Sequence, residues 1–141
     1  MLRIATIAIL AATLNSPAWA GETPSPPDAN VYFINLKDGD TVQNPVLIRF
    51  GLVGMGVAPA GVEKPDTGHH HLLIDAQPPA GEELDYPLPA DGQHKHFGGG
   101  KTQVTMDLPK GTHALQLRLG DLNHIPHNPP VMSGRIMVTV E

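Results

Sequence analysis

The sequence contains no cysteine, and this absence excludes several classes of protein at once. Without thiols there is no disulfide framework, no cysteine-ligated zinc finger and no cysteine nucleophile. Serine is scarce as well, and after residue 20 it occurs at Ser25 and Ser133. No Gly-x-Ser-x-Gly turn and no phosphate-binding loop is present. Serine and cysteine hydrolases and nucleotide-binding proteins therefore find no support in the sequence.

Basic residues are also few, with nine Lys and Arg against fourteen Asp and Glu. Binding to nucleic acid requires a basic stripe that neutralises phosphates, and none exists here. The acidity instead fits a chain that attracts cations and does not bind anionic surfaces.

The first twenty residues have the pattern of a secretory signal peptide. Arg3 supplies the positive start, residues 4–14 are almost wholly apolar or small, and Ala18-Trp19-Ala20 has the small-x-small form that signal peptidase cleaves. The apolar run is too short to span a membrane comfortably. We therefore expect cleavage after Ala20, export to the periplasm or beyond, and a mature chain without a membrane span. Loss of Arg3 leaves eight basic and fourteen acidic residues, a formal charge of −6.

The mature chain is long enough for one small domain. Residues 21–30 are rich in proline and polar residues, which predicts a flexible leader, so the domain is expected over residues 31–141. Apolar residues alternate with polar ones in short runs separated by Gly and Pro, and no segment shows a helical period. We expect strands within residues 31–36, 46–50, 70–75, 102–108, 112–119 and 131–140. This pattern predicts an all-β, antiparallel, immunoglobulin-like sandwich, with a small open barrel as the alternative.

Eight histidines are the conspicuous feature of the chain, and seven fall in three clusters. The clusters lie at 69–71, at 94 and 96, and at 124 and 127. Imidazole is the commonest protein ligand for borderline transition metals. Histidines two positions apart on a strand share a face. The residues that we expect to converge as metal ligands at one end of the sandwich are His71, His94, His96, His124 and His127.

The remaining three histidines are expected to do something else. His70 and His113 share faces with leucine and isoleucine, which predicts core residues with satisfied ring nitrogens. His69 follows Gly68, and a turn there would leave it in solvent. The scattered methionines add little to a copper(I) interpretation, so the expected cofactor is a copper or zinc ion.

Four segments also resemble a known family. They are VYFINLKDGDTVQNPVLIRFGLVGMGVAPAG (31–61), GHHHLLID (68–75), QHKHFGGGKT (93–102) and LPKGTHALQLRLGDLNHIPHNPPV (108–131). Together they are similar to the bacterial family called domain of unknown function 4399. The resemblance implies a small exported protein but no activity and no site residues. A looser similarity links the His-containing pattern to β-sandwich modules that handle metals in the periplasm.

Three functions of different class remain open at this point. The favoured one is a periplasmic metal-binding protein for copper or zinc sequestration or delivery. The second is an immunoglobulin-like module whose His-rich loops bind a periplasmic protein partner without metal. The third is a metal-dependent hydrolase or oxidase, since a His-bound metal can activate water. The sequence offers no catalytic residue, so an enzyme is the less favoured class.

Overall fold

Strands make up nearly all of the regular structure in the computed structural model, which describes residues 21–141. The expected signal peptide lies outside the described residues. Each of the six segments expected to be extended contains a strand, and three further short strands join them. The strands are β1 (Asn30–Phe33), β2 (Asp40–Val42), β3 (Val46–Val53), β4 (Gly56–Val57), β5 (Thr67–Ile74), β6 (His94–His96), β7 (Gln103–Met106), β8 (Gly111–Gly120) and β9 (Ile136–Val140).

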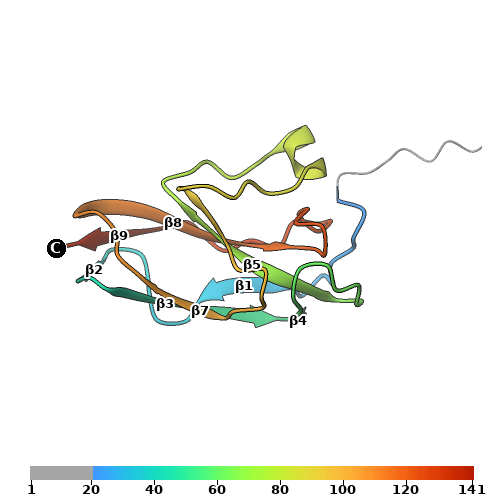
Figure 1. Cartoon of the computed structure of the whole chain (residues 1–141), viewed down its shortest axis with the longest axis horizontal. Helices are drawn as coiled ribbons and strands as arrows, with labels where there is room; N and C mark the ends of the chain where they lie inside the picture. The colour runs from blue at the N-terminus through green and yellow to red at the C-terminus, as the bar shows by residue number, and fades with distance from the viewer. Residues whose placement is uncertain (1–20) are drawn as a thin grey trace, which may run out of the picture.

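The strands form two sheets, and neither closes into a barrel (Figure 1). The smaller sheet has the order β1-β3-β7, and the larger has the order β2-β9-β8-β5-β4, with β6 also paired to β5. Most neighbours are antiparallel, as expected, but β2 runs parallel to β9 and β4 runs parallel to β5. The fold is an all-β sandwich, and the barrel alternative is wrong.

The hydrophobic core lies between the two sheets. Strand β8 shows how the sequence builds it, because Leu115, Leu117 and Leu119 are fully buried and alternate with the polar Gln116 and Arg118. The alternation directs the leucines toward the smaller sheet and the polar side chains toward the outer face of the larger one. The core residues of the other strands follow the same rule: Val31, Ile48, Phe50, Leu72, Ile74, Val138 and Val140.

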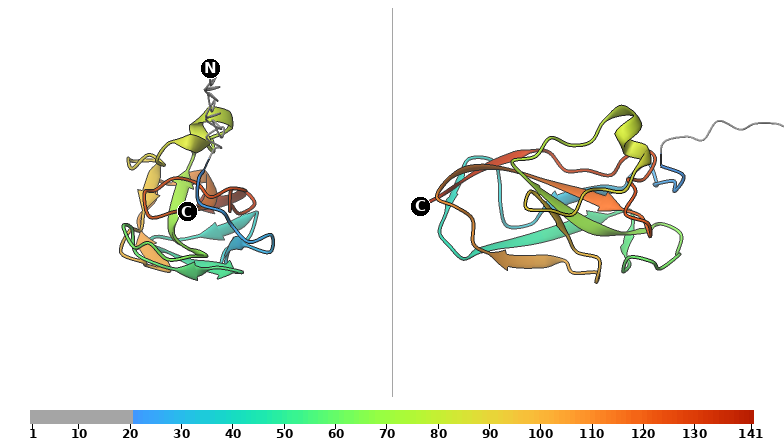
Figure 2. Two further views of the ribbon diagram at one scale, coloured as in Figure 1. Left: turned by 90° about the vertical axis from the view of Figure 1, so that its right-hand side faces the viewer. Right: turned by 45° about the horizontal axis from the view of Figure 1, so that its top comes forward.

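The outer face of the larger sheet is not left bare, because two long irregular segments cover part of it (Figure 2). One is the proline-rich excursion over residues 76–93, which contains the 3-10 helix η1 (Gly81–Asp85). The other is the segment over residues 121–135 that joins β8 to β9. These coverings explain why all of the last eight residues of β8 are buried, polar ones included.

The segment expected to be a flexible leader contacts the loop after β8. Gly21 is buried, and the backbone amide of Asn128 donates to the carbonyl of Thr23 at 2.9 Å. The amide of Ser25 in turn donates to the carbonyl of Asn128 at 3.1 Å. The structure thus joins the beginning of the described chain to the end of the sandwich where β8 finishes.

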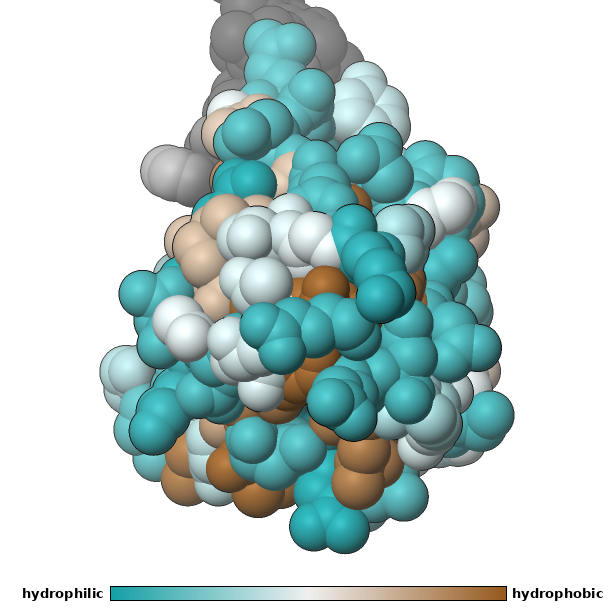
Figure 3. All heavy atoms as spheres, turned by 90° about the vertical axis from the view of Figure 1, so that its left-hand side faces the viewer, coloured by the Kyte–Doolittle hydropathy of each residue, from teal (hydrophilic) through white to brown (hydrophobic). Residues whose placement is uncertain are grey.

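The opposite end of the sandwich carries the C-terminus. Hydrophilic residues cover most of its surface, and apolar residues appear in small separate areas (Figure 3). Among the described residues, no helix has the length and apolarity needed to cross a bilayer.

Candidate metal centre

Strand β5 sends two histidines to the outer face of the larger sheet and one to the core. His70 lies on the core side, where its ring centroid is 5.1 Å from that of Phe50. His69 and His71 point the other way, as strand alternation requires. Both are buried, with 0% and 1% of their surface exposed. The expectation that His69 would lie in solvent is therefore wrong, because β5 begins at Thr67 and the loops of this end cover it.

The third and fourth histidines of the group come from β6 and from the turn after β8. His96 is the antiparallel partner of His71 across β5 and β6, so the two side chains share a face. His124 follows β8 in a tight turn and has a left-handed backbone with φ of +67°. Such a conformation is uncommon for residues other than glycine and costs free energy, so the surrounding structure must hold it.

Asp121 is the residue that holds this turn. Its Oδ1 accepts hydrogen bonds from the backbone amides of Asn123 at 2.8 Å and Ile125 at 2.9 Å. Its Oδ2 accepts from the Thr23 hydroxyl at 2.7 Å. The amide of His124 donates to the Asp121 carbonyl at 3.0 Å and closes the turn. Because both of its carboxylate oxygens accept hydrogen bonds, Asp121 fixes the position from which the His124 ring reaches the group.

Further backbone hydrogen bonds tie the neighbouring loops to the same turn. The amide of Leu88 donates to the His124 carbonyl at 2.8 Å, and the amide of Gly61 donates to the Leu122 carbonyl at 2.9 Å. The amide of Ala60 donates to the Gly98 carbonyl at 2.8 Å, just after β6. Four segments distant in sequence therefore meet at this end of the sandwich, the end that faces the viewer in the left view of Figure 2.

The ring nitrogens of His69, His71, His96 and His124 converge on a small volume. One nitrogen from each lies within 4.8 Å of the others. The Nε2 atom of His69 is 3.0 Å from the Nδ1 atom of His124 and 3.0 Å from the Nε2 atom of His71. Two ligands of a tetrahedral zinc ion, each bonded at 2.0–2.1 Å, lie about 3.3–3.4 Å apart. The spacing of these residues, hereafter the four-histidine cluster, fits a single transition-metal ion.

Hydrogen bonds between the four rings cannot satisfy all of the converging nitrogen atoms. An imidazole nitrogen carries either one hydrogen or one lone pair, so His69 Nε2 cannot donate to one close neighbour and accept from the other. A metal ion would engage the converging lone pairs together, and it would fix the tautomers of the rings.

The electrostatics of the site also favour the metal-binding form of imidazole. Burial lowers the pKa of His71 to about 2, and repulsion from His69, His96 and His124 adds to this effect. Burial, followed by repulsion from His124 and His96, lowers the pKa of His69 to about 4, against the opposing effect of Asp121. Burial and His124 lower the pKa of His96 as well. These three rings are therefore neutral near pH 7, the state in which they bind metals.

Two glycines leave room for the rings of the cluster. A Cβ atom on Gly120 would lie 2.8 Å from His71 Nε2, and one on Gly98 would lie 2.5 Å from His96 Nε2. Neither glycine has a positive φ, so the need for glycine there is a need for space. In both cases the backbone comes so close to a ring nitrogen that even alanine would displace the imidazole.

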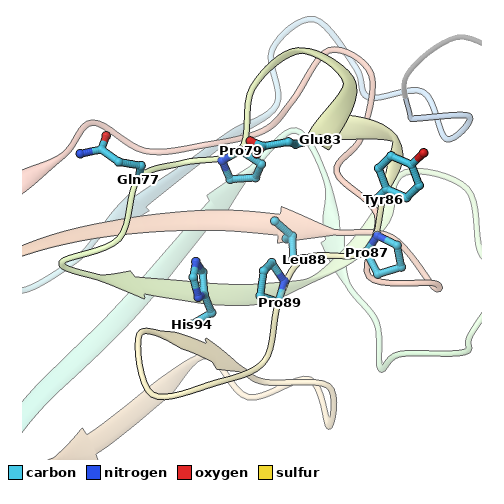
Figure 4. Close-up of a pocket in the computed structure, with 8 residues that line it drawn as sticks. All are labelled: Gln77, Pro79, Glu83, Tyr86, Pro87, Leu88, Pro89 and His94. Carbon is cyan, nitrogen blue, oxygen red and sulfur yellow. The ribbon is translucent and has the colours of Figure 1, made fainter.

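The structure thus brings together three of the five expected ligands, His71, His96 and His124, and adds His69. His94 lies away from the group and its Nδ1 contacts Asp91 Oδ1 at 2.8 Å. It borders a surface pocket formed with Pro79, Leu88 and other residues of the excursion (Figure 4).

His127 also lies outside the group, since its Nε2 donates to the Thr67 carbonyl at 3.1 Å. The i, i+2 relation of His69 to His71 was the signal that could have identified the missed ligand. His70 lies in the core as expected, but its ring nitrogens have no hydrogen-bond partner there, contrary to the expectation. Both nitrogens of His113 are satisfied, by Asp75 and by the Pro109 carbonyl.

The four-histidine cluster lies at the rim of the domain. His69 and His71 are buried, His124 is half-buried and His96 is exposed. An ion held there would be enclosed by β5 on one side and accessible from solvent at His96.

Fold and site together define the class: an all-β sandwich with a group of four histidines that could hold a metal ion. The family model described as "Domain of unknown function (DUF4399)" matches residues 48–141, and the chain belongs to this family. None of the curated proteins matches the chain. None of the solved structures matches it either.

Proposed function

We propose that this protein is a periplasmic metal-binding protein that sequesters or delivers copper or zinc through the four-histidine cluster. The observation that carries the proposal is the convergence of four imidazole nitrogens within 4.8 Å of one another. Three of these rings are held neutral by their surroundings, and the fourth is presented by a strained backbone that Asp121 maintains.

The ligand set favours carriage of the ion over catalysis. Four protein ligands complete a tetrahedral shell, whereas catalytic zinc keeps one position for water or substrate. A nitrogen-only set suits Cu²⁺ and Zn²⁺, and Cu²⁺ stands above Zn²⁺ in the general order of affinities. We expect one ion per chain and tighter binding of Cu²⁺ than of Zn²⁺.

Export is the second part of the proposal, and the sequence of residues 1–20 supports it. Among the described residues, Gly21 is buried and the Thr23 hydroxyl donates to Asp121 at 2.7 Å, so the first residues of the expected mature chain contact the folded domain. N-terminal sequencing of protein from the periplasmic fraction should begin at Gly21, and an intact Met1 species recovered from membranes would contradict export.

The metal proposal is tested by counting ions on protein expressed without an affinity tag. Metal-free protein is titrated with Zn²⁺ and separately with Cu²⁺, and bound metal is measured by elemental analysis after gel filtration. His71→Ala should reduce the affinity about 100-fold or more, if the 10–16 kcal/mol typical of four-ligand zinc sites is shared among the ligands.

His94→Ala is the matched control, because it removes an imidazole two residues from His96 but outside the cluster. It should bind metal like the unaltered protein. Absence of a bound ion, or equal losses in the two variants, would refute the proposed site.

A further inference from the structure

A buried arginine lies on the same sheet face as the four-histidine cluster. Arg118 is the antiparallel partner of His71 across β5 and β8, so the two side chains lie next to each other on the outer face. Only 2% of the Arg118 surface is exposed. Its Nε and Nη1 atoms have no hydrogen-bond partner in the described chain, and its Nη2 donates to the Met132 sulfur at 3.2 Å.

This arrangement is costly because a guanidinium retains its charge in proteins. An unpaired buried charge costs several kcal/mol, and a thioether sulfur is a weak acceptor that compensates little. Within the described residues no carboxylate forms an ion pair with Arg118, since the two ion pairs present there join histidines to Asp91 and Asp75. The side chain of Gln116, on the same face of β8, also leaves its Oε1 buried without a donor.

The charge balance of this face indicates what is missing. A divalent ion in the four-histidine cluster adds two positive charges to that of Arg118, because the ligating imidazoles are neutral. Asp121 is the buried acidic residue of the described chain, and its carboxylate already accepts three hydrogen bonds. One carboxylate cannot balance three positive charges, and the guanidinium is the one of them that is shielded from solvent, so a further anion would be stabilised beside it.

We propose that Arg118 binds a small oxyanion, of carboxylate or phosphate type, which accompanies the metal ion in the adjoining four-histidine cluster. This inference rests on the proposed metal-binding function. Met132 is 46% exposed and its sulfur contacts Nη2 of the guanidinium, so we expect the Met132 side chain to give way when the anion binds. An oxyanion replaces the weak sulfur contact with charge-assisted hydrogen bonds, which are about twice as strong as neutral ones.

Binding of the two ions must then be coupled. Each ion lowers the electrostatic cost of burying the other, and linkage requires the effect to be reciprocal. The anion should therefore bind more tightly to the metal-loaded protein than to the metal-free protein, by about five-fold or more.

The test is a calorimetric titration of Zn²⁺-loaded protein with formate and, in a second arm, with inorganic phosphate. The two arms distinguish a carboxylate from a phosphate source. The unaltered protein should bind at least one of them at a single site. Arg118→Met, which keeps the side-chain volume but removes the charge, should weaken binding at least about tenfold. Arg118→Lys should retain part of the affinity.

The control is Arg49→Gln, because Arg49 is an exposed arginine on β3 of the other sheet. It should leave anion binding unchanged. Thermal unfolding in phosphate provides a second measurement, since phosphate should raise the Tm of the unaltered protein and leave that of Arg118→Met unmoved.

The possible outcomes distinguish failure of the anion site from failure of the proposed metal-binding function. Metal binding with no Arg118-dependent anion binding would overturn the anion site and leave the metal site standing. If no metal binds, the proposed function fails, and the anion site is then tested by titrating the metal-free protein. Anion binding that depends on Arg118 in that titration supports the anion site, and no such binding overturns it.

Discussion

The pair formed by His113 and Asp75 should make the stability of the domain depend on pH in a defined direction. His113 Nδ1 lies 2.7 Å from Asp75 Oδ2, and its Nε2 lies 2.7 Å from the Pro109 carbonyl oxygen. Both partners are acceptors, so the ring satisfies both only when it carries two hydrogens and a positive charge. The hydrogen bond to Asp75 accordingly raises the pKa of His113 above its ordinary value of 6.5, although burial opposes it.

Asp75 shifts in the complementary sense. Burial alone would raise the pKa of its carboxyl, but the hydrogen bonds from His113 and from the Ala114 amide outweigh burial and lower that pKa below 3.8. The stability that His113 contributes is fully present below pH 6.5 and is lost as the pH rises through its raised pKa. The contribution of Asp75 is present above pH 3.8 and is lost as the pH falls through its lowered pKa. The pair should stabilise the fold most between these two limits.

The perturbation is His113→Gln, which keeps a polar side chain but cannot carry the charge. A hydrogen bond to a charged group contributes about 1.5–3 kcal/mol, and the half-exposed carboxylate reduces this through solvent screening. We expect the variant to lose about 1–2 kcal/mol of unfolding free energy at pH 5.5 and clearly less at pH 9, measured by urea denaturation of metal-free protein.

The partner variant for this experiment is Asp75→Asn. Its unfolding free energy should also fall at pH 5.5, and this decrease should become smaller at high pH. Because the pair lies outside the four-histidine cluster, His113→Gln should bind metal normally. A loss that is equal at pH 5.5 and pH 9, or that grows with pH, would refute the assignment of a charged His113.

Three further predictions concern the metal centre. Gly120→Ala should weaken metal binding about tenfold or more, because its methyl group would press on His71 Nε2, whereas Gly92→Ala, in open space, should have no effect on the same titration. Zinc at 100 times its dissociation constant should raise the unfolding free energy by about 2.7 kcal/mol, seen as a rise of about 10 °C in Tm, and no rise would contradict binding to the folded state. In the same assay, zinc should raise the Tm of His69→Ala much less than that of the unaltered protein, because His69 belongs to the cluster. Zinc should raise the Tm of His127→Ala as much as that of the unaltered protein, because His127 bonds to Thr67 outside the cluster. An equal rise in the two variants would be evidence against the ligand assignment.

The fold class could be predicted from local patterns because strand alternation is a property of neighbouring residues. The leucines at every second position of β8 determine which face is buried, and Gly and Pro mark the turns. The short strands β2 and β4 carry no such pattern. β2 is held by parallel pairing to β9, a strand distant in the chain, and β4 by parallel pairing to β5 across an irregular loop, and local alternation reveals neither pairing.

For the metal centre, the sequence by itself determined that β5 would place His69 and His71 on one face, and it offered His96 and His124 as further candidate ligands from other segments. Only the tertiary structure decided which imidazoles meet. His94 and His96 have the same spacing as His69 and His71, but His94 contacts Asp91, and His96 pairs with His71 because of the register between β5 and β6. His124 and His127 share one loop, yet Asp121 directs the first toward the cluster, while the second bonds to the start of β5. Register and turn geometry arise from contacts between distant segments, and a choice among neighbouring histidines therefore needs the folded chain.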